Sequence, residues 1–490
     1  MRAARKQKRK IRPRKDEPPD LLARLNERVT LQARADGSIL ASVDGYPMEL
    51  GRFGPEAEAG AVDLRTGVPL GWLAKSGRAN REVNDLVRQL AQLGFVEYRL
   101  GRAGENADIV AIEPQTRDYW PRLPKLAATD TLALSRFAYL RRRGDALVLE
   151  SPRAKALFRI GDQAVAAALV TLARPQKLGR LRQSDGFPGD ALIALLIDCD
   201  ILFKVAPETE GLRWDEGDSD LILFDFHDLL FHARSAEGRH ANPFGGAYPH
   251  VDVIAPLPSA RPAWPGPAID LAKFEAQPSP VAALFRERHS VREFDAQAPI
   301  TLAELAQFLD GTARVLSHWQ SPIDEDGGGP VVDFTGRPYP SAGSAYPLEL
   351  YLAVGHCADL PRGFYHYDAD AHALTRIPAK DEPLQAMLHA AEFAMDAPGP
   401  PQVLITIAAR FGRTSWKYTS IAYSLILKDV GALLQTFYLM AANMALGGCA
   451  IGTHNIDLFE QMTRLAFYAE GPVGQFALGR PAKPSEGRAG

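Results

Sequence analysis

The chain has 490 residues, of which 46% are hydrophobic and 23% are charged. This composition excludes a disordered chain and provides enough apolar residues for roughly two or three domain cores. The formal net charge of -3 gives no overall reason to expect nucleic-acid binding. Cys199, Cys357 and Cys449 lie far apart, so they predict neither a disulfide framework nor a metal site. We therefore expect a protein of the reducing cytoplasm with no metal centre.

Residues 1–20 form a basic tail. It begins MRAARKQKRK and runs into DEPPD without an apolar core segment, which argues against a standard secretory signal. A block of like charges is typical of a disordered, solvated tail. A role in binding nucleic acid or a membrane surface is the less favoured alternative.

One pattern occurs twice in the front half. LQARADGSILAS predicts a β-hairpin, and NREVNDLVRQLAQLGFVEYRL predicts a helix that Gly94 ends before a strand. YLRRRGDALVLES and GDALIALLIDCDILFKV repeat the hairpin and the helix–strand ending. We therefore expect two tandem winged-helix-like domains, at 21–115 and 116–212, each of about a hundred residues.

Residues 213–280 begin with a helical pattern and continue as a proline-rich linker. His227 and His232 lie in the helical part, but residues five apart do not share a helical face. Asp225 and Asp228 do not complete a ligand spacing with both histidines. Packing or interface roles are favoured over metal binding.

The longest apolar stretch is VGALLQTFYLMAANMALGGCAIG. It carries Gln435 and Asn443, and Gly447 and Gly448 break it after about 17 residues, short of the ~20 that a membrane span requires. Apolar residues surround most of the predicted helix. We expect a core helix packed on nearly all sides.

Arg288, Ser290 and Arg292 alternate just before a helix that is predicted to begin at Thr301, with Glu304 completing a capping box. In an extended segment, alternate side chains point the same way. Two guanidinium groups and a hydroxyl suit a phosphate, because arginine offers a planar, permanently charged fork. A solvated basic turn is the alternative, and on spacing alone it is favoured.

The loop PSAGSAYP runs from Pro340 through Ser341, Ala342 and Gly343 into an apolar strand. Its side chains are so small that backbone N–H and C=O groups can approach a flat ring and bond its edge. A second proline two residues before Pro340 adds rigidity. A plain turn between strands, the alternative, would not need that rigidity.

Lys417 and Tyr418 directly precede the long apolar helix. Partial burial of the lysine beside a phenol hydroxyl would allow the pair to take or relay a proton. A lysine at a helix start with a packing tyrosine is the ordinary alternative. Beyond the helix, Gly452 offers another close backbone approach, and Arg480 in FALGRPAKP is a further candidate anion contact.

Taken in this order, the pieces resemble the nitroreductase fold. They are R-x-S-x-R, a small-residue loop entering a strand, a long apolar helix ending in glycines, and LGRP. PSAGSAYPLELYLAV, FHDLLFHARS and KYTSIAYSLILKDVGALLQTFYLMAANMALGGCAIG are similar to the SagB/ThcOx group of that superfamily. The resemblance covers roughly residues 220–485. It implies an α+β fold class, with a nitroreductase-like FMN-binding domain at 281–490 preceded by domains that resemble peptide-recognition domains.

The resemblance also implies a reaction and its residues. Members of this group are FMN-dependent dehydrogenases that oxidise thiazolines and oxazolines in a precursor peptide to thiazoles and oxazoles, with electrons passing to oxygen. By this resemblance Arg288, Ser290 and Arg292 hold the FMN phosphate and ribityl chain, and residues 341–343 line the isoalloxazine. Lys417 and Tyr418 would take the ring proton as hydride passes to the flavin. The group further implies a homodimer, a leader peptide bound by the winged-helix-like units, and a cyclodehydratase as a candidate partner.

Two other classes of function stay open. An NAD(P)H-dependent nitro- or quinone reductase is the nearer alternative, and the Lys417–Tyr418 pair and the large front half argue against it. A non-catalytic binding module is the farther one, and a protein without flavin would favour it. The sequence does not decide the precursor peptide, the preferred ring, or which winged-helix-like copy binds a leader.

Overall fold

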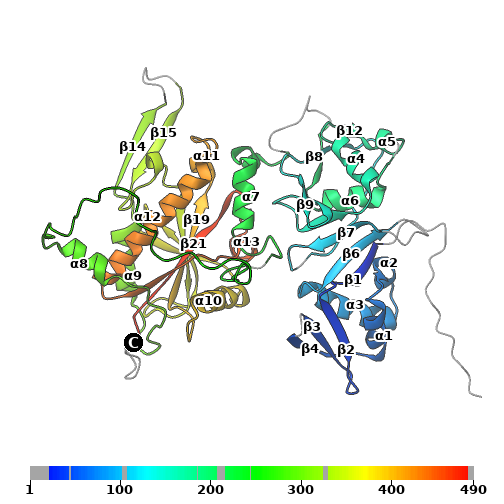
Figure 1. Cartoon of the computed structure of the whole chain (residues 1–490), viewed down its shortest axis with the longest axis horizontal. Helices are drawn as coiled ribbons and strands as arrows, with labels where there is room; N and C mark the ends of the chain where they lie inside the picture. Colours follow the sequence, from blue (N-terminus) through cyan, green and yellow to red (C-terminus); the bar gives the residue numbers. More distant parts are fainter. Residues whose placement is uncertain are drawn as a thin grey trace, which may run out of the picture. The chain divides into compact units, whose positions relative to one another are not determined.

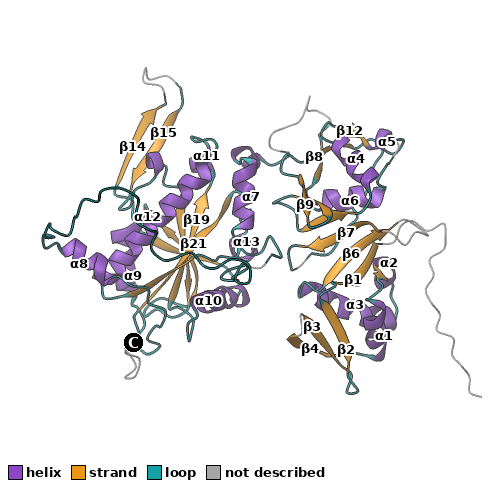
Figure 2. Ribbon diagram, viewed as in Figure 1, coloured by secondary structure: helices purple, strands orange, loops and turns teal. Residues whose placement is uncertain are grey.

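The structure is a computed structural model that describes residues 21–43, 46–101, 108–117, 119–184, 186–206, 216–242, 244–323 and 329–483. The basic tail predicted at 1–20 lies outside the described residues. The chain divides into two compact units (Figures 1 and 2). The first is 1–222 with 229–234 and 238–241, and the second is 223–228 with 235–237 and 242–490.

The N-terminal unit is built on a seven-stranded antiparallel sheet. Its strand order is β5 (Val68–Pro69), β1 (Leu21–Leu25), β6 (Val96–Gly101), β7 (Asp108–Pro114), β11 (Ala156–Ile160), β10 (Ala146–Glu150) and β9 (Tyr139–Arg143). Two three-stranded sheets accompany it: β2 (Val29–Ala33), β3 (Ser38–Val43) and β4 (Tyr46–Arg52), and β12 (Gln176–Lys177), β8 (Thr131–Leu134) and β13 (Leu202–Lys204). The helices are α1 (Pro55–Asp63), α2 (Leu70–Leu73), α3 (Arg78–Gln92), α4 (Gln163–Thr171), α5 (Leu178–Leu181) and α6 (Asp190–Asp198).

The repeated pattern of the sequence is confirmed at the level of these elements. β2 pairs with β3 and β9 pairs with β10, as the two predicted hairpins. Helix α3 ends before Gly94, whose φ of 74° provides the left-handed turn into β6, and α6 likewise leads into β13. The β7–β11 ladder joins the two copies within one sheet and one apolar core. The division into two domains and their winged-helix geometry stay predictions.

The C-terminal unit is a six-stranded antiparallel sheet between two pairs of helices (Figure 2). The strand order is β18 (Ala373–Ile377), β17 (Gly363–Asp368), β16 (Leu348–Val354), β19 (Val403–Arg410), β21 (Glu470–Gly479) and β20 (Gly447–Ile451). Two elements, η1 (Ser219–Leu223) and α7 (Phe226–Arg234), contain residues of both units. The remaining elements of the C-terminal unit are α8 (Pro280–Glu287), α9 (Leu302–Ala313), β14 (Ser317–Pro322), β15 (Val331–Gly336), η2 (Ala342–Ser344), α10 (Asp381–Met395), α11 (Gly412–Ser415), α12 (Ala422–Asn443) and α13 (Ile456–Thr463).

Aromatic and aliphatic side chains fix the helices to the sheet. On one face, Phe308 of α9 and Phe437 of α12 pack at 5.2 Å, and Phe437 lies 5.3 Å from Phe476 of β21. On the other face, α10 and α13 cover Tyr351 and Phe364. Helix α9 begins with the predicted capping box, in which Thr301 and Glu304 satisfy each other's backbone N–H groups.

Helix α12 is less covered than the sequence predicts. Of the helices in the described ranges, it alone is long and apolar enough to cross a membrane by length and composition, a test that core helices also pass. Within the chain, 33% of its 18-residue apolar window is buried, and Leu425, Leu434 and Leu439 are only half-buried. The expected packing on nearly all sides is therefore wrong for the single chain, because the sheet and α9 cover only part of the helix.

Candidate active site

The small-residue loop is held by one carboxylate of the long helix. Ser341 Oγ donates to Asp429 Oδ2 over 2.6 Å, and the backbone N–H of Ala342 donates to Asp429 Oδ1 over 3.1 Å. Ser341 Oγ also accepts from the N–H of Tyr346 at 2.9 Å. Burial raises the pKa of Asp429, and the bonds from Ser341 and Ala342 oppose that shift. Helix α12 thus fixes the predicted ring-binding loop.

The sequence analysis missed Asp429. The available signal was a carboxylate in the middle of an otherwise apolar helix, where an acid is rarely buried without partners. Asp429 is 5% exposed. The loop supplies those partners.

Gly343 brings the loop against the Lys–Tyr pair. Its φ of 54° lies in the left-handed region, which favours glycine. A Cβ at this position would clash with Oη of Tyr418 and lie 2.6 Å from Nζ of Lys417. Lys417 Nζ also donates to the carbonyl oxygen of Gly343 over 3.4 Å. Two sequence motifs, the loop and the Lys–Tyr pair, therefore form one site.

Lys417 itself is exposed, and Tyr418 is half-buried. The partial burial expected for the lysine is therefore wrong in the single chain. The reason is local: the pair lies in the short turn between α11 and α12, and no helix of the same unit covers the amine.

The R-x-S-x-R segment follows α8 in a non-helical conformation and converges on Tyr438 of α12. Ser290 Oγ and Tyr438 Oη share a hydrogen bond of 2.8 Å, and the guanidinium of Arg288 lies 5.0 Å from the centre of the Tyr438 ring. Tyr438 Oη also accepts from the N–H of Ala450 at 2.8 Å. The sequence analysis missed Tyr438, because an apolar helix gives no sign of which tyrosine meets a distant segment.

Arg292 lies near Cys449 at the start of β20. Burial raises the pKa of the Cys449 thiol, while the positive charge of Arg292 opposes that rise. The N–H of Val291 donates to Gly448 O over 2.9 Å, which fixes the segment between the two arginines. The structure therefore groups Arg288, Ser290 and Arg292 around Tyr438 and β20.

Arg480 and Gly452 were predicted to contact the cofactor, but their surroundings in the structure do not require such a contact. Arg480 Nη2 donates to both carboxylate oxygens of Glu304 at 2.8 Å, so an anion would have to compete with that ion pair. Gly452 follows β20 and is exposed, and a Cβ there would meet open space. Neighbouring protein atoms therefore do not require a glycine at 452.

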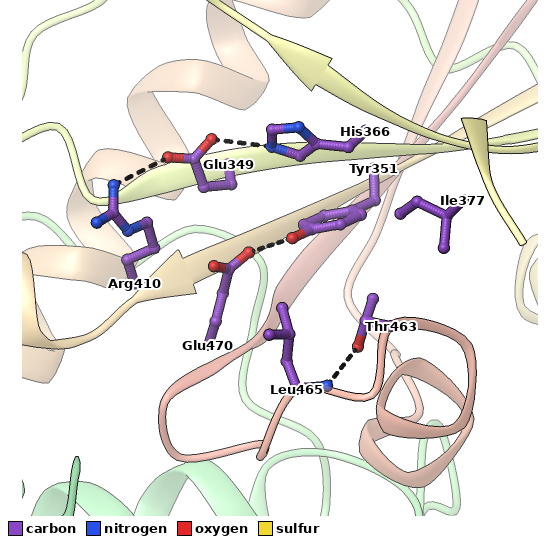
Figure 3. Close-up of a pocket in the computed structure, with 8 residues that line it drawn as sticks. All are labelled: Glu349, Tyr351, His366, Ile377, Arg410, Thr463, Leu465 and Glu470. Carbon is purple, nitrogen blue, oxygen red and sulfur yellow. Dashed lines mark hydrogen bonds and ion pairs between the residues drawn. The ribbon is translucent and has the colours of Figure 1, made fainter. Parts of the chain in front are cut away.

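A separate open pocket of about 380 Å³ lies beside β16 and β21. Figure 3 shows Glu349 between His366 and Arg410, at 3.3 and 3.7 Å, and Tyr351 donating to Glu470 Oε1 over 2.6 Å. Burial raises the pKa of Glu470, and the Glu349 carboxylate raises the pKa of His366. Its lining contains none of the residues predicted from the sequence.

Parts of both units are similar to known proteins. Residues 285–480 match the nitroreductase family model, and residues 132–241 match the model of the cyanobactin oxidase ThcOx. A protein of Methanocaldococcus jannaschii named as a nitroreductase is 29% identical over 182 residues, which is 37% of this chain and 83% of that protein.

Two solved structures are similar in part. The McbBCD microcin synthetase complex of E. coli has a TM-score of 0.38 at 17% identity, covering 56% of this chain and 99% of that chain. A nitroreductase-like protein of Ralstonia eutropha has a TM-score of 0.33 at 23% identity, covering 47% of this chain and 100% of that chain. Both TM-scores are low, so the two solved structures carry no argument about this chain, and the class of protein follows from the matches to the family models.

The C-terminal unit is therefore a nitroreductase-like domain, and the chain is an oxidoreductase. The match at 132–241 makes the chain similar, in addition, to the cyanobactin oxidase ThcOx.

Proposed function

We propose that this chain is an FMN-dependent dehydrogenase that oxidises thiazoline or oxazoline rings in a ribosomally made precursor peptide to thiazoles or oxazoles. Electrons pass to oxygen. The observation that carries the proposal is the meeting of Gly343 with Lys417 and Tyr418, since it sets an amine and a phenol beside a loop suited to a flat ring.

The residues present fit FMN in two respects. Arg288, Ser290 and Arg292 are donors of the kind that hold a phosphate ester and a ribityl chain. The small side chains of residues 340–343 leave the loop backbone able to approach a flat ring, on the loop that contacts Lys417 and Tyr418 at Gly343. Gly452 would add a backbone contact, and Arg480 would add a charge if Glu304 released it.

The chain's own residues would handle the proton. FMN, when bound, supplies the two-electron acceptor for the hydride and returns the electrons to oxygen. Conversion of an azoline to an azole removes one hydride and one proton, so a base of the protein must lie beside the ring carbon that loses the proton. Lys417 Nζ would accept that proton, and Tyr418 Oη would orient or relay it.

The N-terminal unit would bind the leader peptide. Sheets β2–β3–β4 and β12–β8–β13 each present two edge strands, and an extended leader peptide would bind by adding a strand to one of them. A cyclodehydratase is the further partner. The half-buried apolar side of α12 supports a homodimer. We further propose that the enzyme is cytoplasmic and has no nucleic-acid or membrane partner.

Two measurements test this function. The purified protein should show a flavin absorbance spectrum, and mass spectrometry of an azoline peptide incubated with it should show loss of two hydrogens per ring. The match to the nitroreductase family keeps an NAD(P)H-dependent nitro- or quinone reductase as the alternative. Rapid NADPH oxidation with a nitroaromatic, without azoline oxidation, would favour that alternative.

A further inference from the structure

Among the described residues, strands β14 and β15 pair with each other in a two-stranded ribbon that stands apart from the six-stranded sheet (Figure 1). An isolated two-stranded ribbon is marginally stable in water, because it has little apolar surface to bury. This ribbon nevertheless carries Trp319, which is 43% exposed. A single exposed aromatic side chain is ordinary on a protein surface, so the residues around Trp319 decide whether it marks a binding site.

The two faces of the ribbon differ in chemistry. Trp319 lies directly opposite Phe334 in the register, and their rings stack at 5.6 Å with an interplanar angle of 15°. Alternation places His318 and Gln320 on the opposite face, where they bond Asp370 and Asp333 at 2.7 and 2.6 Å. The face of Trp319 and Phe334 is therefore aromatic, whereas polar side chains lie on the other face beside Pro322 and Val331.

The aromatic face reaches the candidate active site. Lys417 Nζ lies 5.7 Å from the centre of the Phe334 ring, on the same amine that bonds Gly343. The surface made by Trp319 and Phe334 is thus continuous with the proposed proton-accepting group. A peptide whose reacting ring carbon lies beside Lys417 Nζ would extend along the surface of Trp319 and Phe334.

Arg413 holds the ribbon in that position. Its Nε donates to the carbonyl oxygen of Ala345, in the turn after the small-residue loop, over 3.1 Å. Its Nη2 donates to the carbonyl oxygen of Asp333, in β15, over 3.1 Å. One guanidinium therefore ties the ribbon to the loop proposed to line the cofactor, so the aromatic surface has a defined place beside the site.

We propose that Trp319 and Phe334 form a substrate subsite, an aromatic platform that binds the apolar side chain and peptide group next to the ring being oxidised. This inference rests on the proposed function. Flat, rigid aromatic rings give a large contact area at little conformational entropy, and they stack well on planar peptide groups. The platform would therefore select apolar or aromatic residues beside the reacting ring.

The test uses the full-length flavoprotein and two azoline peptides that differ only in the residue after the ring, phenylalanine or aspartate. Trp319→Ala should raise KM for the phenylalanine peptide about tenfold, the loss expected for one aromatic contact, with kcat and flavin content unchanged. The preference for phenylalanine over aspartate should shrink to the same extent. Gln320→Ala, on the opposite face of the ribbon, is the matched control and should change neither value.

A binding measurement separates this inference from the proposed function. Fluorescence anisotropy with the labelled phenylalanine peptide should show the same loss in Trp319→Ala, even in a protein that oxidises no azoline. Trp319→Leu, which keeps the face apolar, guards against misfolding and should also weaken binding. Unchanged affinity in both variants would overturn the platform. A change in molar mass by light scattering without a change in peptide affinity would assign the ribbon to a second copy of the chain and would also overturn it.

Discussion

Lys417 donates a hydrogen bond to the carbonyl oxygen of Gly343 over 3.4 Å, although 74 residues separate them in the chain. This contact joins the two motifs on which the proposed chemistry depends. A methyl group added at Gly343 would therefore meet both Tyr418 and Lys417.

Gly343→Ala should impair flavin retention and activity together. The new Cβ would clash with Tyr418 Oη, and the left-handed φ of 54° would add roughly 1–2 kcal/mol of backbone strain. Absorbance after gel filtration measures the bound flavin. Gly399→Ala, where a Cβ meets open space, is the control and should bind flavin normally. Full flavin occupancy and turnover in Gly343→Ala would contradict the proposed approach of the loop to a ring.

Asp429→Ala should loosen the loop and destabilise the protein. The substitution leaves the hydroxyl of Ser341 and the N–H of Ala342 without their acceptor, at a cost of about 1–3 kcal/mol. Asp429→Asn retains one acceptor oxygen and should lose less. Urea unfolding gives the free energies of unfolding, and equal stability of the two variants would argue against Asp429 as the anchor.

Tyr438→Phe should weaken binding of the FMN phosphate without unfolding the domain. It removes the hydroxyl that Ser290 and the N–H of Ala450 both contact. The dissociation constant for FMN should rise severalfold, by the ~1 kcal/mol typical of a hydrogen bond. Fluorescence titration of the apoprotein measures it. Tyr365→Phe, which loses only a bond to Pro361 O, is the control, and equal FMN affinity in both variants would refute the role.

Glu470→Gln should stabilise the protein at pH values above the unfolded-state pKa of Glu470, and not below it. Burial raises the folded-state pKa of Glu470 above its unfolded value, so the ionised form is penalised in the folded chain. Below the unfolded pKa of about 4.3, both states are protonated and glutamine gives no advantage. The advantage should grow as pH rises from there through the raised folded pKa.

Thermal unfolding between pH 5 and pH 8 tests this titration. Glutamine still accepts the hydrogen bond of Tyr351, so that contact is preserved. Glu275→Gln, at an exposed position, is the control and should show no such trend. A pH-independent difference between Glu470→Gln and the parent protein would contradict burial as the cause.

Local sequence signals predicted the elements well, and non-local contacts were harder to predict. Hairpins, the Gly94 stop and the Thr301 capping box depend on residues close in sequence, and the structure confirms them. Asp429 acts on Ser341 across 88 residues and Tyr438 acts on Ser290 across 148, and neither has a local pattern. The coverage of α12 was overestimated because apolar composition does not reveal which protein surface will pack against a helix.

The central claim is that Lys417 accepts the ring proton beside a bound flavin. The most direct measurement is mass spectrometry of an azoline peptide incubated with Lys417→Ala, together with the absorbance spectrum of that variant. The account predicts a protein with its full flavin spectrum that no longer removes two hydrogens from the ring. A Lys417→Ala protein that oxidises the ring at the parent rate would contradict the account.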